Sequence, residues 1–276
     1  MHSYKELEES YRKALEIAKA LPRIPIGDET IIVSTTRARA AARILYMGIL
    51  HSGKQVFLST PTETMYHLLP YRETGKVIVF NDEPRSLRIV GLVESAGLLG
   101  AEITIITPRL HPAVNERVQQ QNAEIIEVPD KDPLLTMAIY ALLNTPSLMG
   151  TRQDRFQGEL DHLDSALEWM RDKITAEETR LVEDSETLYY TPATEPGGYY
   201  YYALTGKYPL PLDALIPGKA KGLVILTGVE ELTYKDIIMQ YRIRGGQKRI
   251  LKIDTDPITA GFYSILAVIL LTGRTT

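Results

Sequence analysis

Lys76 to Pro108 reads KVIVFNDEPRSLRIVGLVESAGLLGAEITIITP, and this stretch decides the fold. It opens with the apolar run Val77–Phe80 and continues through the polar loop Asn81–Ser86 into a helical pattern that runs from about Arg85 to Leu99. A Gly-Ala turn then leads into a second apolar run, Glu102–Thr107. Short apolar runs joined through a helix predict two parallel strands, each buried on both faces.

The same alternation runs through the rest of the first half. Further strands are predicted at residues 29–34, 55–59 and 124–128, and further helices at residues 4–21, 38–51 and 113–121. Five short apolar strands separated by helices predict a three-layer α/β/α domain with a mainly parallel sheet.

The second half repeats this pattern in weaker form. Strands are predicted at residues 188–192, 222–227 and 248–253, and a helix at residues 234–244. Asp132-Pro133 follows the last strand of the first half, Asp256-Pro257 follows the last strand of the second, and a buried helix follows each pair. We interpret this as an internal duplication, with one domain at residues 1–148 and another at 149–276, each with about five strands.

Residues 151–180 separate the two copies and carry an amphipathic pattern. They predict the leading helix of the second domain, the counterpart of residues 4–21. The apolar positions that share its predicted face are Phe156, Leu160, Leu163, Leu167 and Met170.

Composition excludes several classes of protein. The 276 residues are 44% hydrophobic and 24% charged, which is ordinary for a globular protein, and the absence of cysteine excludes disulfides and thiolate sites. A net charge of -4 gives no general attraction to nucleic acid or to acidic lipid. Ile258–Thr272 is too short to cross a bilayer, and the N-terminus lacks the pattern of a signal peptide. We therefore expect a cytoplasmic protein that binds neither nucleic acid nor membrane.

The run VSTTRARAAARILYMGILHSGKQVFLSTPTET from Val33 resembles the opening of sugar isomerase (SIS) domains, especially those of 6-phospho-3-hexuloisomerases. These read Val-Gly-x-Gly-Arg-Ser, then an Ala-rich helix with a His-x-Gly end, and Arg37, His51 and Gly53 stand at corresponding places. Lys76–Pro108 is similar to the strand, Ser-x-Ser-Gly-x-Thr loop and helix that follow in the family. The two-domain layout resembles that of archaeal phosphoglucose/phosphomannose isomerases.

The resemblance implies two tandem SIS-like domains packed face to face, with a ligand cleft between the carboxyl ends of their strands. It also implies a sugar phosphate as ligand and a homodimer. The P-loop, dinucleotide and His-Glu-x-x-His patterns are absent from the sequence, so we expect neither a cofactor nor a metal. The residues expected to bind ligand are Ser34, Thr35, Thr36, Arg37, Ser59, Thr60, Asn81, Arg85 and Ser86.

The sequence departs from the family at the second loop. The two serine positions fall at Asn81 and Glu83, the glycine at Pro84 and the threonine at Ser86. A carboxylate repels phosphate and proline lacks an N–H donor, so phosphate binding here is the weaker hypothesis. The stronger one is that Asn81 or Asp82 caps the following helix.

Candidates for acid/base chemistry are His51, Glu83 and His162. His51 matches the His-x-Gly histidine of the family, although a histidine that ends a helix and faces solvent is the commoner case. Glu159 and His162 lie three residues apart on a predicted helix and share a face, which is more often a solvated polar stripe than a catalytic pair.

In the second half, Gly197-Gly198 could admit a phosphate, although a turn is the simpler interpretation. Tyr199–Tyr202 cannot all be buried on one helix face, so some of them are expected to line an interface or a ligand cleft.

Three functions follow. The first is a protein that binds a carbohydrate derivative such as a phosphosugar, with little or no catalysis. The second is an active phosphosugar aldose–ketose isomerase rebuilt around Arg37, Arg85, Glu83 and a histidine. The third is a non-catalytic structural or regulatory subunit whose Tyr-rich surface binds a protein.

Overall fold

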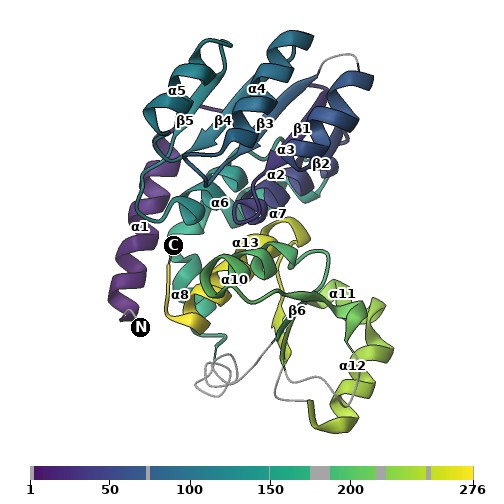
Figure 1. Ribbon diagram of the computed structural model, residues 1–276. Coiled ribbons are helices and arrows are strands. Elements are labelled where there is room, and N and C mark those ends of the chain that lie inside the picture. Colours follow the sequence, from purple (N-terminus) through teal and green to yellow (C-terminus); the bar gives the residue numbers. More distant parts are fainter. Residues whose placement is uncertain are drawn as a thin grey trace. The chain divides into compact units, whose positions relative to one another are not determined.

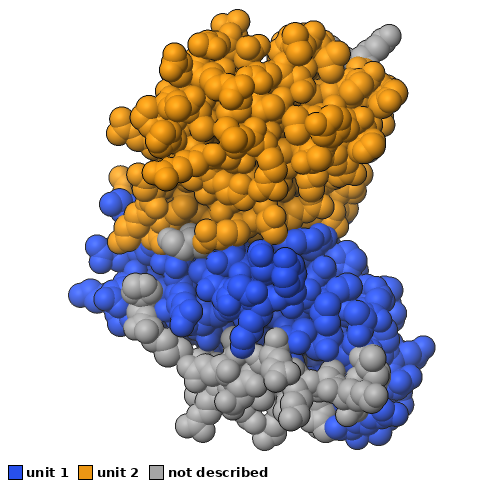
Figure 2. All heavy atoms as spheres, in the orientation of Figure 1, with its two compact units in different colours: residues 1–13, 151–276 blue, residues 14–150 orange. Residues whose placement is uncertain are grey.

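The computed structural model describes residues 3–72, 75–148, 150–174, 187–215, 222–246 and 250–275. The chain divides into two compact units, which Figure 2 shows in different colours. Unit 1 comprises residues 1–13 and 151–276, and unit 2 comprises residues 14–150. Residues 1–13, which the sequence assigns to the first domain, therefore group with the second half.

Unit 2 is built on a five-stranded sheet with the order β2-β1-β3-β4-β5, in which every pairing is parallel. The chain leaves β1 toward one side of the sheet to form β2 and returns to the other side to form β3. The carboxyl ends of β1 and β3 are therefore a topological switch point, the place where open α/β sheets bind ligands. The strands are β1 (Glu29–Ser34), β2 (Gln55–Ser59), β3 (Lys76–Phe80), β4 (Glu102–Thr107) and β5 (Glu124–Glu127).

Helices cover both faces of this sheet, as Figure 1 shows. Ile31, Val33, Val77 and Val79 lie in the buried core that α4 and α5 cover. Across the other face α2 packs on α6. The helices and turns of this part are α1 (Tyr4–Ala20), α2 (Arg39–His51), α3 (Pro61–Glu63), η1 (Thr64–Leu68), η2 (Leu69–Tyr71), α4 (Leu87–Leu99), α5 (Pro112–Gln119) and α6 (Pro133–Leu143).

Unit 1 repeats the plan with four described strands in the parallel order β7-β6-β8-β9. Its switch point lies between the carboxyl ends of β6 and β8. The predicted α/β class with two parallel sheets is confirmed, but the described residues form one strand fewer here than in unit 2. The strands are β6 (Thr187–Tyr190), β7 (Leu210–Pro211), β8 (Gly222–Thr227) and β9 (Ile250–Ile253).

Two helices pack together on one face of this sheet, α10 (Glu195–Thr205) and α13 (Pro257–Thr272). α12 covers the other face, where Ile238 and Tyr241 enter the core. Nearly every residue of α13 is buried, as its sequence predicts. Within the described parts of the chain, no helix is long and apolar enough to cross a membrane. The remaining elements are η4 (Leu212–Ala214), α11 (Gly228–Thr233), α12 (Lys235–Tyr241) and η5 (Arg242–Gly246).

Gly197 and Gly198 lie in the first turn of α10 and serve the packing of that helix. A Cβ on Gly197 would stand 2.6 Å from the Ser264 hydroxyl on α13, and one on Gly198 would stand 2.7 Å from the Tyr190 ring. The turn predicted for this pair is therefore wrong, because the glycines allow close contact within a helix.

The leading helix predicted for residues 151–180 is wrong as one continuous element. The structure has α7 (Arg152–Asp161), the 3-10 turn η3 (Leu163–Ser165) and α8 (Ala166–Arg171), while residues 175–180 lie outside the described parts. Two hydrogen bonds, one local and one from a distant part of the chain, favour the break. The Ser165 hydroxyl donates to the His162 carbonyl at 3.1 Å, and the Tyr11 hydroxyl donates to the Leu163 carbonyl at 2.6 Å.

Candidate functional site

A carboxylate occupies the switch point of unit 2. Thr35 follows β1 directly, and its hydroxyl donates to Asp82 Oδ1 at 2.5 Å. The Asp82 backbone N–H donates in return to the Thr35 hydroxyl at 3.1 Å. Arg37 Nη1 lies 3.6 Å from Asp82 Oδ2. We call Thr35, Arg37 and Asp82 the Asp82 cluster; the sequence predicts two of its three members as ligand-binding residues.

Burial dominates the electrostatics of Asp82. Only 3% of its side chain is exposed, and this desolvation raises the pKa of the carboxyl, while the Thr35 hydrogen bond and the Arg37 charge lower it. Asp82 Oδ2 is buried and accepts no hydrogen bond, and the Ser34 hydroxyl at the end of β1 is likewise buried without a hydrogen-bond partner. The end of β1 and the loop after β3 therefore keep two polar atoms with unused hydrogen-bonding capacity.

Asn81 shapes the second loop and does not cap a helix. Its Nδ2 donates to the Glu83 carbonyl at 3.1 Å and to the Thr107 hydroxyl at 3.0 Å, and its Oδ1 accepts the Glu83 N–H at 3.2 Å. Ser86 is the N-cap residue of α4 and makes no side-chain capping bond. The cap predicted from Asn81 or Asp82 is therefore wrong, because both side chains are used before the helix begins.

The backbone of this loop offers little to phosphate. The N–H groups of Asp82, Glu83 and Ser86 are already hydrogen-bonded within the protein, and Pro84 has none. Loops that hold phosphate direct such donors at the ligand. The loop that resembles the family's phosphate loop thus uses three of its backbone donors within the protein.

The other predicted ligand residues hold local structure or lie at the surface. The Ser59 hydroxyl donates to Glu63 at 2.9 Å, and the Thr60 hydroxyl accepts the Glu63 N–H at 3.3 Å, which caps the short helix α3. Thr36 and Arg85 are exposed. Their roles as ligand residues stay predictions.

The three catalytic candidates are divided between the two units. Glu83 is paired with Arg88 at 2.8 Å. His51 ends α2, twelve residues after Arg39, so it stands about 18 Å along that helix from its start. His162 is exposed at the end of α7 in the other unit. No two of these side chains are hydrogen-bonded to each other in the part of the chain that the structure describes.

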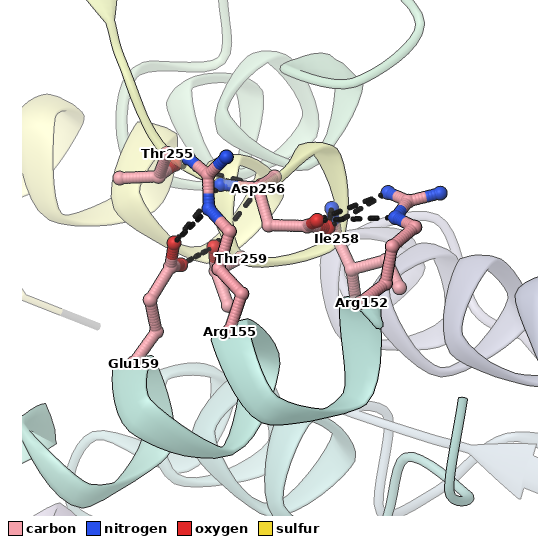
Figure 3. A network of polar contacts seen from close by, with 7 residues as sticks. All are labelled: Arg152, Arg155, Glu159, Thr255, Asp256, Ile258 and Thr259. Carbon is pink, nitrogen blue, oxygen red and sulfur yellow. Dashed lines mark hydrogen bonds and ion pairs between the residues drawn. The ribbon is translucent and has the colours of Figure 1, made fainter. Parts of the chain in front are cut away.

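Glu159 has a structural role that Figure 3 shows. Its Oε1 accepts the Asp256 N–H at 3.1 Å and lies 3.4 Å from Arg155 Nε, and its Oε2 accepts the Thr259 hydroxyl. The carboxylate therefore ties α7 to the start of α13. The predicted pairing of Glu159 with His162 on one face is not formed, because Glu159 turns to α13.

The two Asp-Pro pairs match in sequence but differ in geometry. Asp256 is extended at φ −61°, accepts the Ile258 N–H and pairs with Arg152 at 2.9 Å (Figure 3). Asp132 is left-handed at φ 53° and makes no side-chain capping bond to α6. The duplicated signature therefore marks the start of a helix in both units without fixing one local structure.

Unit 1 also has a carboxylate at its switch point. Thr191 follows β6 directly and donates to Glu230 Oε2 at 2.5 Å, and the Ala193 N–H donates to Oε1 at 2.9 Å. The Thr227 hydroxyl donates to Oε2 at 2.9 Å and forms a capping box with Glu230 at the start of α11. We call Thr191, Ala193, Thr227 and Glu230 the Glu230 cluster. The Thr-x-x-Glu spacing at 227–230 is the signal that could have found it.

The tyrosine run is divided between core and partial exposure. Tyr200 and Tyr201 are buried, whereas Tyr199 and Tyr202 are half-buried. The Tyr202 and Tyr208 ring centroids lie 4.5 Å apart. The four rings are therefore not all buried, as the helical spacing predicts, and an interface or ligand role for the others stays a prediction.

Hollows elsewhere on the described surface do not contain the predicted ligand residues. One of 640 Å³ lies over α11 and α12 and is lined by Leu232, Met239 and Ile243, among others. Two of 380 and 390 Å³ lie at the amino ends of the strands of unit 2, beside Lys76 and Glu102. Among the described residues, no three His, Asp or Glu side chains gather closely enough to hold a metal ion.

No protein-family model and no curated protein matches the sequence. Solved structures match the fold over nearly the whole chain. A candidate sugar binding protein from Salmonella typhimurium LT2 is 12% identical, with a TM-score of 0.62 over 97% of this chain and 98% of that one. Tagatose-6-phosphate ketose/aldose isomerase from Escherichia coli is 13% identical, with a TM-score of 0.62 over 99% and 89%.

Glucosamine-6-phosphate deaminase from Thermotoga maritima is 11% identical, with a TM-score of 0.65 over 98% of this chain and 90% of that one. The chain therefore has the fold of phosphosugar isomerases and related SIS proteins. At these identities the likeness defines the fold alone. The closer resemblance to 6-phospho-3-hexuloisomerases stays a prediction.

Proposed function

We propose that the protein binds a carbohydrate derivative at the Asp82 cluster and does not isomerise it. The observation that carries this proposal is a carboxylate, a hydroxyl and a guanidinium gathered at the switch point of a sugar-isomerase fold. Such groups donate and accept the hydrogen bonds that sugar hydroxyls need. The sugar binding protein and the two sugar-phosphate enzymes that share the fold support a carbohydrate ligand.

The proposal leaves out isomerisation because the predicted bases lie outside the cluster and one oxygen of Asp82 is already engaged. Enediol chemistry needs a base within hydrogen-bond reach of the substrate carbon. Asp82 Oδ1 is engaged by Thr35, Glu83 by Arg88, and His51 stands at the far end of α2. A homodimer and a cytoplasmic location, which the sequence predicts, complete the proposal.

One observation favours the alternative of an active isomerase. Burial raises the pKa of Asp82, and a carboxyl group shifted in this direction beside a cation is a pattern found at acid/base sites. In this alternative Asp82 is the base, in place of the predicted Glu83 and a histidine.

A thermal-shift panel tests the binding proposal. Hexoses, pentoses, amino sugars and their phosphates are added at millimolar concentration to the wild type, to Thr35→Val and to the matched control Glu83→Ala. A ligand that binds the native state raises the melting temperature, and Thr35→Val reduces that rise while Glu83→Ala preserves it. If no carbohydrate raises the melting temperature of the wild type, the proposal is wrong and the structural or regulatory subunit remains.

Coupled isomerase assays on each hit separate binding from catalysis. The proposal expects no turnover by the wild type. Turnover that Asp82→Asn abolishes would instead establish the alternative, because the amide keeps the shape of the side chain but cannot accept the proton.

A further inference from the structure

We propose that Asp82 stands in for the anionic group of a ligand, so that the carbohydrate bound at the Asp82 cluster carries no phosphate. This inference rests on the proposed function and names the chemical class of its ligand, an uncharged sugar. It runs against the sugar phosphate that the family resemblance implies.

The Asp82 carboxylate lies beside groups of the kind that bind anions. Thr35 and Arg37 lie in the loop between β1 and the thirteen-residue helix α2, and hydroxyls, guanidinium groups and helix starts are the donors that proteins use for anions. Asp82 Oδ1 already takes the Thr35 hydroxyl at 2.5 Å, and Oδ2 lies 3.6 Å from Arg37. An arriving phosphate finds the Thr35 hydroxyl already bonded to an anion of the protein itself, and the Arg37 charge already paired with it.

The charge of the buried Asp82 carboxylate also disfavours a phosphate. Only 3% of the Asp82 side chain is exposed, so water screens its charge poorly. Like charges at close range repel strongly in such surroundings. The backbone of the loop 81–86 offers little to offset this repulsion, because the N–H groups of Asp82, Glu83 and Ser86 are used and Pro84 has none.

Unit 1 also pairs a threonine after a central strand with a carboxylate, but with different residues. Thr191 follows β6 as Thr35 follows β1, and each donates to a carboxylate from the loop or helix after the next central strand at 2.5 Å. The carboxylate is Glu230 in unit 1 and Asp82 in unit 2, at different distances from the ends of β8 and β3. Both switch points therefore hold a carboxylate of the protein itself.

Two polar atoms at the cluster have hydrogen-bonding capacity left for a ligand. Asp82 Oδ2 is buried and accepts no hydrogen bond, and the Ser34 hydroxyl is buried without a hydrogen-bond partner. A sugar hydroxyl can donate to the carboxylate oxygen, and this charge-assisted bond is stronger than one between neutral groups. The unused capacity of the cluster therefore suits a hydroxyl group and disfavours a second anion.

Isothermal titration calorimetry with matched ligand pairs tests the inference. Glucose, fructose and N-acetylglucosamine are each compared with their own 6-phosphate on the wild type. We expect at least one parent sugar to bind about tenfold or more tightly than its phosphate. Asp82→Asn should reverse this preference, since it removes the charge but keeps the shape, so the phosphate gains affinity and the parent sugar loses it. Glu83→Ala, which removes a neighbouring carboxylate that is half-exposed and paired with Arg88, should change the ratio far less than Asp82→Asn does.

Two results would overturn the inference alone. One is a wild type that binds a sugar phosphate as tightly as its parent sugar or more tightly, and the other is an unchanged ratio in a folded Asp82→Asn variant. A wild type that binds neither member of any pair overturns the proposed function as well. The comparison of ligand pairs on the wild type needs no variant, so it decides the question even if Asp82→Asn does not fold.

Discussion

The Asp82 and Glu230 clusters place a carboxylate at equivalent positions of two sheets, but they satisfy it to different degrees. Both oxygens of Glu230 accept hydrogen bonds, from Thr191, Ala193 and Thr227. Only Oδ1 of Asp82 does so, and its Oδ2 lies near the half-exposed side chain of Arg37. At the switch point of unit 1 the protein therefore hydrogen-bonds both carboxylate oxygens itself. At that of unit 2 one carboxylate oxygen still has hydrogen-bonding capacity for a ligand.

The largest expected effect is that of Glu230→Ala. It leaves the buried Thr191 and Thr227 hydroxyls and the Ala193 N–H without their acceptor and removes the capping box of α11, which together should cost about 2–4 kcal/mol of unfolding free energy. Denaturant unfolding monitored by circular dichroism measures this cost.

Glu231→Ala is the matched control for Glu230→Ala. Glu231 lies one residue further along α11 and pairs with Lys252 at 3.1 Å near the surface, so its loss should cost no more than about 1 kcal/mol. Equal losses in the two variants would show that the Glu230 cluster is not a closed structural site.

Gly197→Ala should have the next largest effect. α2 begins with buried alanines where α10 has buried glycines, and the new Cβ would meet the Ser264 side chain and backbone at 2.6–2.9 Å. Such overpacking typically costs about 1–3 kcal/mol. Unfolding free energy measures it, and Gly158→Ala is the control, because a Cβ there meets open space within α7. The control should gain up to about 1 kcal/mol, and a Gly197→Ala variant as stable as the wild type would contradict the packing argument.

A smaller and pH-dependent effect is expected of Asp82→Asn. Burial raises the pKa of Asp82 in the folded state above its unfolded value of about 3.9, so its contribution to stability is fully present below that value and is lost as pH rises through the folded pKa. Asparagine does not titrate, so the variant does not lose stability in this way as the pH rises. Its stability relative to the wild type should therefore rise between about pH 4 and neutral pH, which denaturant unfolding across that range measures.

Whether the relative stability of Asp82→Asn rises or falls with pH shows whether burial or the contacts with Thr35 and Arg37 dominate the pKa of Asp82. A relative stability of Asp82→Asn that falls with rising pH would mean that Thr35 and Arg37 outweigh the desolvation of the carboxylate. The Asp82 cluster would then be as well satisfied as the Glu230 cluster, and the comparison between them would fail.

The smallest expected effect is that of Glu83→Ala. Its ion pair with Arg88 at 2.8 Å joins two half-exposed side chains, so its removal should change the unfolding free energy by less than about 0.5 kcal/mol. A loss as large as that of Glu230→Ala would show that the second loop depends on Glu83, and it could then not serve as a control.

Local patterns predicted the elements within a few residues. β3 was expected at 77–80 and lies at 76–80, and β4 lies at 102–107 as expected. These predictions succeed because strands buried on both faces must be continuously apolar and the loops between them polar. The single leading helix at 151–180 fails because the Leu163 carbonyl is taken by Tyr11, a partner 152 residues away.

The candidate site was predicted in part. Thr35 and Arg37 were named from the family pattern, whereas Asp82 was expected to cap a helix and Glu230 was not singled out. Asp82 has no local signal for its role at the switch point, and the Thr-x-x-Glu spacing at 227–230 signals only the capping box that Glu230 forms with Thr227. Thr35 and Asp82 are 47 residues apart in the chain, and Thr191 and Glu230 are 39 apart. Only the pairing of β1 with β3 and of β6 with β8 brings them together.

The sequence by itself determined the α/β class, the parallel strands, the buried α13 and the altered loop 81–86, because burial and helix or strand periodicity are written in neighbouring residues. Tertiary structure alone decided that this loop uses three of its backbone donors within the protein and that a carboxylate lies at each switch point. The physical reason is that hydrogen bonds and desolvation at the ends of parallel strands depend on residues from separate loops, which come into contact only when the sheet forms.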